Sequence, residues 1–241
     1  PPPPADQVPM NGALAEAVDP RDEYVAEAVK LASGDAAARA DLRIVLTAMH
    51  GVGAPLTSRV LEEAGFTHVS LVAAQAEPDP DFPTVPFPNP EEAGALDMAI
   101  EQARAEDADL IIAVDPDADR CALAVPDPAA EAGWRPLSGD QIGCLLGEFL
   151  ASRGIQGSLA NSIVSSRLLA RIAHAHGLVH HTTLTGFKWI ARAPELAFGY
   201  EEAIGFCPDP TAVRDKDGVA TSVVLASLAA ECKAAGTTLL E

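Results

Sequence analysis

Short apolar runs alternate with amphipathic stretches along the first half of the chain. Runs of about four to eight β-branched or leucine-rich residues are typical of buried strands, and apolar positions three or four residues apart are typical of helices. The pattern predicts strands at 42–47, 69–72 and 110–114, and helices at 22–32, 58–64 and 93–106. Such alternation is typical of a parallel sheet flanked by helices. A proline-dominated loop at 78–90 interrupts it.

The same alternation resumes after a break at residues 126–134. Ser138-Gly-Asp140 and Asp217 are good helix caps. The pattern predicts strands at 159–164, 179–183 and 196–198, and helices at 141–152, 165–176 and from Asp217 to about 234. We therefore expect an α/β protein with two consecutive domains, at 21–130 and 131–241, whose mixed, largely parallel sheets are flanked by helices. Proline-rich residues 1–20 are expected to be a linker.

Composition narrows the class of protein. The 241 residues suffice for one or two cores, and 48% hydrophobic with 21% charged residues is globular rather than disordered. A net charge of -19 disfavours nucleic acid as a partner, because phosphate backbones are bound by basic surfaces. No apolar run approaches the roughly 20 residues of a membrane helix. The 4 widely spaced cysteines indicate reduced thiols and a cytoplasmic location.

Three aspartates at alternate positions directly follow the predicted strand at 110–114. They belong to the hexapeptide Asp115-Pro-Asp-Ala-Asp-Arg120, which an arginine closes. Carboxylate oxygens select Mg²⁺, Ca²⁺ or Mn²⁺, and Mg²⁺ held by a few carboxylates usually keeps coordination positions for a substrate phosphate. The hexapeptide therefore predicts a divalent-cation site, with Asp115, Asp117 and Asp119 as metal ligands and Mg²⁺ as the cofactor.

Other interpretations of these aspartates can be compared by spacing. An acidic turn is the simplest, because Asp and Pro are common in turns. An EF-hand is excluded, because Arg120 and Pro126 stand where its loop needs Gly and Glu. A haloacid-dehalogenase-type phosphatase also places Asp-x-Asp after a strand, although Asp119 stands where that family has Thr or Val. A free-standing metal-dependent phosphatase or phosphate-binding module therefore stays open as an alternative function.

Motifs in the order of the chain resemble those of the α-D-phosphohexomutases. The resemblance covers residues from about 40 to 241, and it favours the branch with phosphopentomutase-like phosphoglucomutases and many bacterial phosphomannomutases. The segments that carry it are His50-Gly-Val-Gly53, Phe82-Pro-Thr-Val85, Phe87-Pro-Asn-Pro-Glu-Glu92, Asp115-Pro-Asp-Ala-Asp-Arg120, Thr185-Gly-Phe-Lys-Trp-Ile190, Tyr200-Glu-Glu-Ala-Ile-Gly205 and Arg214-Asp-Lys-Asp-Gly218.

The resemblance extends to only the second and third of that family's four domains. The first carries a phosphoserine loop, typically Thr-Ala-Ser-His-Asn-Pro, and the fourth an Arg-x-Ser-Gly-Thr loop that clamps phosphate. Neither sequence occurs in this chain. The resemblance therefore implies a central fragment that is inactive alone. Its partners would be a sugar phosphate and the missing first and fourth domains, and residues 1–20 would be the tail of the first.

For the parent protein, the resemblance implies a Mg²⁺-dependent phosphosugar mutase. Such an enzyme interconverts sugar 1-phosphate and 6-phosphate, or 5-phosphate for pentoses, through a phosphoserine and a bisphosphate intermediate. Asp115, Asp117 and Asp119 would hold Mg²⁺ against the phosphoserine, because phosphoryl transfer depends on positioning and charge stabilisation. Arg120 would be a catalytic residue that donates a forked pair of hydrogen bonds to the same phosphate. A structural salt bridge to its Asp neighbours is the alternative role of Arg120.

The resemblance also implies substrate-binding residues in the second half of the chain. Lys188 would contact the sugar or its phosphate and act as a catalytic proton shuttle, although lysines are more often simply solvated. Glu201 and Glu202 would accept hydrogen bonds from sugar hydroxyls, although acids also favour helix starts. Ala203 stands where the family has serine, which leaves the identity of the sugar open.

Three further positions are weaker candidates. Arg214 and Lys216 precede the last predicted helix, whose N-terminus favours anions, so the resemblance makes them candidates for binding phosphate. Ser165, in a serine-rich stretch like one in the family, is equally a helix cap.

Overall fold

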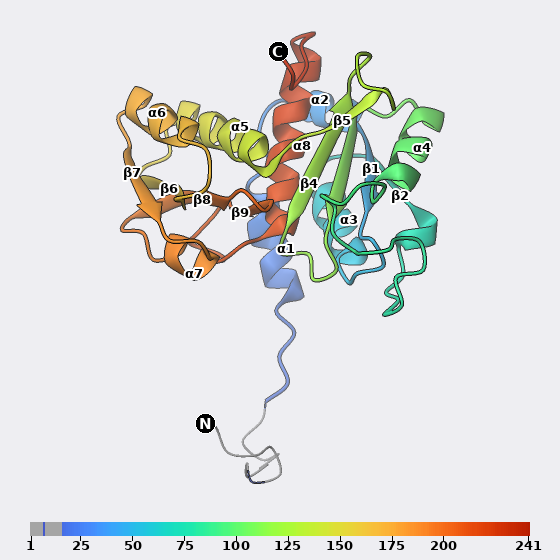
Figure 1. The fold of residues 1–241 in the computed structure, drawn as a ribbon, viewed down its shortest axis with the longest axis horizontal. Helices are drawn as coiled ribbons and strands as arrows, with labels where there is room; N and C mark the ends of the chain where they lie inside the picture. Colours follow the sequence, from blue (N-terminus) through green and yellow to red (C-terminus); the bar gives the residue numbers. More distant parts are fainter. Residues whose placement is uncertain (1–6, 8–15) are drawn as a thin grey trace.

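The computed structural model describes Gln7 and residues 16–241, which contain two mixed sheets. The first has the strand order β2-β1-β3-β4-β5 and the second the order β7-β6-β8-β9 (Figure 1). β2, β1 and β3 pair in parallel, as do β7, β6 and β8, whereas β4, β5 and β9 pair antiparallel. The strands are β1 Arg43–Thr47, β2 His68–Leu71, β3 Leu110–Val114, β4 Cys121–Pro126, β5 Trp134–Pro136, β6 Ser158–Ser162, β7 Val179–Thr183, β8 Leu196–Glu201 and β9 Gly205–Cys207.

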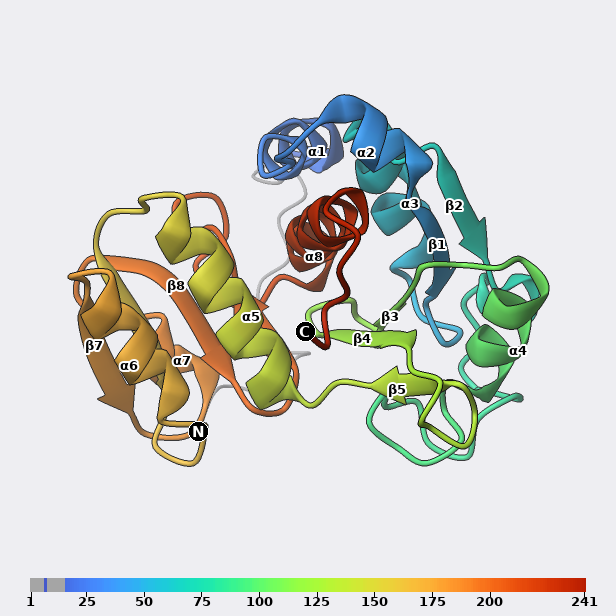
Figure 2. The same cartoon turned by 90° about the horizontal axis from the view of Figure 1, so that it is seen from above.

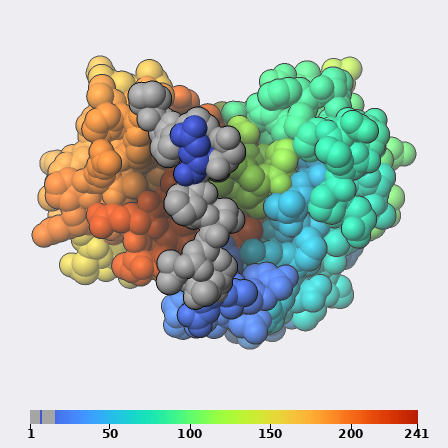
Figure 3. Space-filling view, turned by 90° about the horizontal axis from the view of Figure 1, so that it is seen from below, coloured from blue at the N-terminus to red at the C-terminus, as the bar shows by residue number. Residues whose placement is uncertain are grey.

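Helices cover both sheets, which confirms the predicted α/β fold with mixed sheets flanked by helices. The helices are α1 Arg21–Val29, α2 Ala36–Asp41, α3 Ala54–Glu63, α4 Asp97–Ala105, α5 Gly139–Ser152, α6 Leu168–Ala175, α7 Phe187–Ile190 and α8 Gly218–Ala234, with the short 3₁₀ helix η3 Ala73–Gln75. We call the first sheet with α1–α4 and α8 the first lobe, and the second sheet with α5–α7 the second lobe. Seen from below, the two lobes lie side by side (Figure 3).

Several elements were not predicted from the periodicity. β4 is a buried run without alternation, directly after the aspartates, and β5 and β9 have only 3 residues each. The short helices α2 and α7 have 6 and 4 residues, below the length at which helical spacing becomes visible. The predicted helix at 165–176 begins later, at Leu168, because the preceding serines form a turn.

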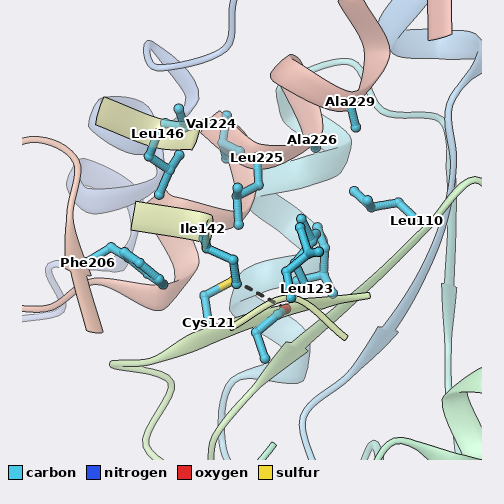
Figure 4. Close-up of a cluster of buried hydrophobic side chains, with 14 of the residues drawn as sticks. Leu110, Cys121, Leu123, Ile142, Leu146, Phe206, Val224, Leu225, Ala226 and Ala229 are labelled. Atoms are coloured by element: carbon cyan, nitrogen blue, oxygen red, sulfur yellow. Dashed lines mark hydrogen bonds between the residues drawn. The ribbon is translucent and has the colours of Figure 1, made fainter. Parts of the chain in front are cut away.

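Helix α8 lies at the centre of the molecule, between the two sheets (Figure 2). It contacts α1, α2, α3, β3 and β4 of the first lobe, and α5 and β9 of the second. Its burial extends around most of the helix, since 12 of its 17 residues are buried. Figure 4 shows Leu225 of α8 near Ile142 of α5 and Leu123 of β4, and Val224 of α8 near Leu146 of α5. One continuous hydrophobic core therefore joins the lobes.

The predicted division at residue 130 does not follow this packing. Trp134–Pro136 adds β5 to the first sheet, and α8 covers the first lobe although it is the last helix of the chain. The physical reason is that α8 is apolar on most of its circumference and must be enclosed on several sides. The assignment of 21–130 and 131–241 to separate domains thus stays a prediction.

Two expectations about bulk properties can be compared with the structure. All 4 cysteines are unpaired, and Cys121, Cys144 and Cys207 are buried. Among the helices that the structure describes, none combines the length and the apolar composition needed to cross a bilayer.

Candidate functional site

The three aspartates form a compact cluster after β3, in a segment that we call the metal loop, Asp115–Arg120. One carboxylate oxygen from each aspartate lies within 4.8 Å of the others. Ala118 has the left-handed φ of 59°, and its amide donates to the Asp115 carbonyl at 2.9 Å, so the loop turns tightly. This turn brings alternate side chains together. A set of three hard oxygen donors fits Mg²⁺, Mn²⁺ or Ca²⁺.

Arg120 fixes the innermost aspartate of the metal loop. Its amide donates to Oδ1 of Asp115 at 3.0 Å and its Nε donates to Oδ2 at 2.6 Å. Asp115 is only 2% exposed, and burial raises the pKa of its carboxyl group against the opposing hydrogen bonds and charge of Arg120. The structural role considered for Arg120 is therefore present, while its contact with phosphate stays a prediction.

The turn after β1 supports the metal loop from one side. The Val52 amide donates to the Pro116 carbonyl at 2.9 Å. Gly51 lies so close to Pro116 that a Cβ there would collide with its backbone. The glycine at this position is therefore required by the close approach of two loops, both at the carboxyl edge of the first sheet.

A second loop, Tyr200–Gly205, lies against the other side of the metal loop; we call it the glutamate loop. The Cys121 amide donates to the Ile204 carbonyl at 3.1 Å, and Arg120 forms an antiparallel β-bridge with Gly205. Backbone pairing thus joins the end of the metal loop and the start of β4, in the first lobe, to the β8–β9 turn in the second. Two loops that were predicted on separate domains are therefore in direct contact.

Side chains reinforce this junction. The Nζ of Lys216 lies 2.6 Å from Oδ2 of Asp119. Burial would lower the pKa of Lys216, but the hydrogen bond and charge of Asp119 and the charge of Glu201 outweigh it and raise the pKa. Burial raises the pKa of Glu201, with Lys216 opposing. Of the predicted site residues, Asp119, Arg120, Glu201 and Lys216 are therefore brought together.

Glu202 is held differently. Its Oε2 accepts hydrogen bonds from the hydroxyls of Ser162 and Ser165, at 2.8 and 2.7 Å, and its amide donates to Oγ of Ser165. Behind them, Oδ1 of Asp140 accepts from the Ser166 amide at 2.6 Å and from the Tyr200 hydroxyl at 2.8 Å. The serine turn that sequence left ambiguous therefore supports the glutamate loop and does not cap α6.

Lys188 and Arg214 lie around α7 and outside this group of contacts. Nζ of Lys188 is 5.8 Å from the centroid of the Trp189 ring, and Nε of Arg214 donates to the Ala191 carbonyl. Both side chains belong to exposed residues. Their roles in binding substrate stay predictions.

Glu91 belongs near the site although we did not predict it. Partial burial raises the pKa of its carboxyl group, the positive charge of Arg120 opposes this shift and the negative charge of Glu202 adds to it, so the charges of the metal loop and the glutamate loop act on Glu91. It follows Phe87-Pro-Asn-Pro90, a motif noted in the sequence, and that motif was the available signal.

Comparisons with known proteins agree with this geometry. Residues 22–129 match the sequence profile of phosphoglucomutase/phosphomannomutase alpha/beta/alpha domain II, and residues 138–241 match that of domain III. A "Probable phosphomannomutase" of Haemophilus influenzae is 48% identical over 222 residues, covering 91% of this chain and 45% of that protein. The phosphoribomutase of Saccharomyces cerevisiae is 40% identical over 212 residues, covering 78% of this chain and 33% of that protein.

A solved structure shows the same arrangement of elements. The crystal structure of a "putative phosphomannomutase" from Thermus thermophilus has a TM-score of 0.77 and 26% identity, and the match covers 92% of this chain and 49% of that one. The chain thus spans less than half the length of these relatives. On these grounds it belongs to the phosphoglucomutase/phosphomannomutase family of the α-D-phosphohexomutases and contains domains II and III of that family.

Proposed function

We propose that this chain supplies the metal loop and the sugar-binding loop of a phosphosugar mutase. The reaction would interconvert sugar 1-phosphate and 6-phosphate, or 5-phosphate for a pentose, through a phosphoserine and a bisphosphate. The backbone pairing of Arg120 and Cys121 with Ile204 and Gly205 is the observation that carries this proposal. It puts the three aspartates beside a loop with a partly exposed glutamate, and this supports a site for a phosphate next to a site for sugar hydroxyls.

Asp115, Asp117 and Asp119 would hold Mg²⁺ in this proposal. Bound there, the cation would neutralise the charge of the transferring phosphoryl group. The cluster fits it by donor type and by the 4.8 Å limit on the distances between its oxygens. Asp117 is the exposed member, so it faces the side from which a phosphoserine of another domain could approach.

The remaining groups would bind and orient the sugar phosphate. Glu201 would accept hydrogen bonds from sugar hydroxyls, and Lys216 beside it would offer a positive charge to phosphate. Lys188 and Arg214 would bind phosphate from the α7 side, with Lys188 as a proton shuttle. We place the reaction in the cytoplasm, where thiols stay reduced.

Metal binding tests the first half of the proposal. Titration of the chain with Mn²⁺, followed by electron paramagnetic resonance, should reveal one site that Mg²⁺ competes for. Asp117→Ala should weaken it by about tenfold or more, since one of three carboxylates is lost. Glu92→Ala, which removes a carboxylate outside the cluster, is the matched control. Equal affinity in the Asp117→Ala chain would reject the metal loop.

A phosphatase that uses Asp115 as nucleophile is disfavoured by the geometry. Asp115 is buried, and both its carboxylate oxygens accept hydrogen bonds from Arg120. The chain alone should therefore release no inorganic phosphate from mannose 1-phosphate in Mg²⁺. Steady release of phosphate that Asp115→Asn abolishes would favour the phosphatase over the mutase.

A further inference from the structure

Two residues at or just before the start of α8 contact the metal loop. Before the helix, Nζ of Lys216 pairs with Asp119 at 2.6 Å. At its first residue, the Gly218 amide donates to the Ala118 carbonyl at 3.1 Å. A Cβ on Gly218 would lie 2.7 Å from the Ala118 carbonyl oxygen, which real Cβ atoms do not tolerate, so the helix and the loop are in direct backbone contact.

Asp217 connects these two contacts. It is only 8% exposed, and its Oδ1 accepts from the Ala220 amide at 2.8 Å, which caps α8. Its own amide donates to the Phe206 carbonyl of β9 at 2.8 Å. Asp217 therefore ties the start of α8 to β9, at the point where the helix meets the metal loop.

Tyr24 holds Asp217 from the far end of the sequence. Its hydroxyl donates to the same Oδ1 at 2.6 Å, across a separation of 193 residues. Tyr24 lies on α1, whose helix packs against α8. Its hydroxyl reaches the capping residue of α8, which in turn borders the metal loop through Gly218.

We infer that Tyr24 and Asp217 are positioning residues of the metal loop. Tyr24 orients the Asp217 carboxylate, Asp217 caps and orients α8, and the start of α8 holds Ala118 between the second and third aspartates. The two hydrogen bonds to a single carboxylate oxygen restrict the cap more than either would alone. The contacts alone support the positioning of the metal loop. The expected effect on cation affinity rests in addition on the proposed function.

Tyr24→Phe in the full 241-residue chain tests the inference, because it removes one hydroxyl and keeps the ring. Amide hydrogen exchange of the metal-free chain should become about three- to tenfold faster at Gly218 and Arg120, the range expected for losing one hydrogen bond. Mn²⁺ affinity should fall about threefold at a temperature where the chain is fully folded. Val25→Ala is the control, since Val25 is the next residue of α1 and is 1% exposed. It should lower the melting temperature and leave both readouts unchanged.

Variants of the cap separate geometry from general destabilisation. Asp217→Asn keeps an oxygen that can accept both hydrogen bonds and should behave like the unsubstituted chain. Asp217→Ala should accelerate amide exchange and weaken Mn²⁺ binding more than Tyr24→Phe does. The inference is overturned if exchange at Gly218 and Arg120 is unchanged in Tyr24→Phe, or changes equally in Val25→Ala. If the unsubstituted chain binds Mn²⁺ no better than Asp117→Ala, the proposed function fails, and the exchange rates still decide the positioning.

Discussion

The two neighbouring glutamates of the glutamate loop have different surroundings, which implies different roles. Oε2 of Glu202 is occupied by the hydroxyls of Ser162 and Ser165. Glu201 instead lies near Lys216, and burial raises its pKa, so the fold does not stabilise its charge. We therefore expect Glu202 to hold the loop and Glu201 to meet the ligand.

Stability measurements can separate these roles. Glu202→Gln should lower the free energy of unfolding by about 1 kcal/mol, because a neutral amide oxygen accepts weaker hydrogen bonds from the serine hydroxyls than a charged carboxylate oxygen does. Glu201→Gln should stay within about 0.5 kcal/mol of the unsubstituted chain. Urea unfolding at neutral pH checks both. A larger loss for Glu201→Gln would reverse the assignment.

The contribution of Glu202 should also depend on pH in a definite direction. Burial would raise the pKa of Glu202, but hydrogen bonds from Ser165, its own amide and Ser162 outweigh it and lower the pKa below the ordinary 4.5. A lowered pKa in the folded state stabilises the fold above the ordinary value, and this stability is lost as the pH falls through the folded pKa. The difference in melting temperature between the unsubstituted chain and Glu202→Gln should therefore be largest above about pH 5 and shrink in acid. A difference that grows in acid would contradict the lowered pKa.

The site residues differ in how readily they could be predicted from the sequence. Asp115, Asp117 and Asp119 could be predicted, because a local turn alone brings ligands at alternate positions together. Tyr24 could not, since its partner is 193 residues away and nothing near it in the sequence marks the contact.

Helix α5 shows how an element sets the position of the glutamate loop. Gly139, Gly143 and Gly147 lie one helical turn apart and face the second sheet. A Cβ on Gly139 would collide with the Glu202 carbonyl, and one on Gly143 would lie 2.5 Å from the Tyr200 ring. On Gly147 it would meet the end of the Leu169 side chain, which can move. The helix therefore lies closest to the loop at its N-terminal end.

Alanine substitutions along α5 should follow this gradient. Each substitution gains about 1 kcal/mol of helix propensity. The collisions of the new Cβ therefore decide whether the variant is more or less stable than the unsubstituted chain. Gly139→Ala should be the most destabilising, Gly143→Ala should cost about 1–3 kcal/mol as overpacking does, and Gly147→Ala should be nearly neutral. Chemical unfolding of the three variants checks the order. Similar losses at all three positions would show that the glycines are not there for close packing.

At the level of elements, the sequence predicted helices with one buried face and strands rich in β-branched residues or leucine, such as β3. Most of the longer helices and strands were predicted, although their boundaries shifted. Helix α3, for example, was predicted at 58–64 and spans Ala54–Glu63. β4 was missed because Cys121–Val125 contains two alanines and a single β-branched residue, so it lacks the composition that marked the equally buried β3 as a strand. β5 was missed because a strand of 3 residues is defined by its pairing with β4 and not by its own sequence.

The whole molecule is expected to unfold as one unit, because α8 and a continuous core join the lobes. An ion pair between Arg153 of α5 and Glu231 of α8 adds a polar link. The sequence did not predict this, since an apolar helix at the end of a chain does not reveal which sheet it covers.

The two tryptophans can test it, since Trp134 lies in β5 of the first lobe and Trp189 in α7 of the second. Trp189→Phe and Trp134→Phe each leave one fluorescent reporter. In each variant the fluorescence midpoint of thermal unfolding should coincide with that from circular dichroism. Midpoints that differ by more than about 5 °C within one variant would show that the lobes unfold separately.

The central claim is that this chain can supply the metal loop and the glutamate loop of an active phosphosugar mutase. The chain contains no Thr-Ala-Ser-His-Asn-Pro segment, so we expect it to interconvert no sugar phosphates alone. A chimera would test it: residues 22–241, which the two family profiles span, would replace the matching segment of the Haemophilus influenzae relative, which is 48% identical over 222 residues.

The decisive measurement is the conversion of mannose 1-phosphate to mannose 6-phosphate by this chimera in Mg²⁺, with the intact Haemophilus protein as reference. We predict turnover by the chimera, a loss of at least about hundredfold in its Asp117→Ala variant, as for removal of a group that stabilises transition-state charge, and no loss in Glu92→Ala. A folded chimera without turnover, or turnover that Asp117→Ala leaves unchanged, would contradict the account.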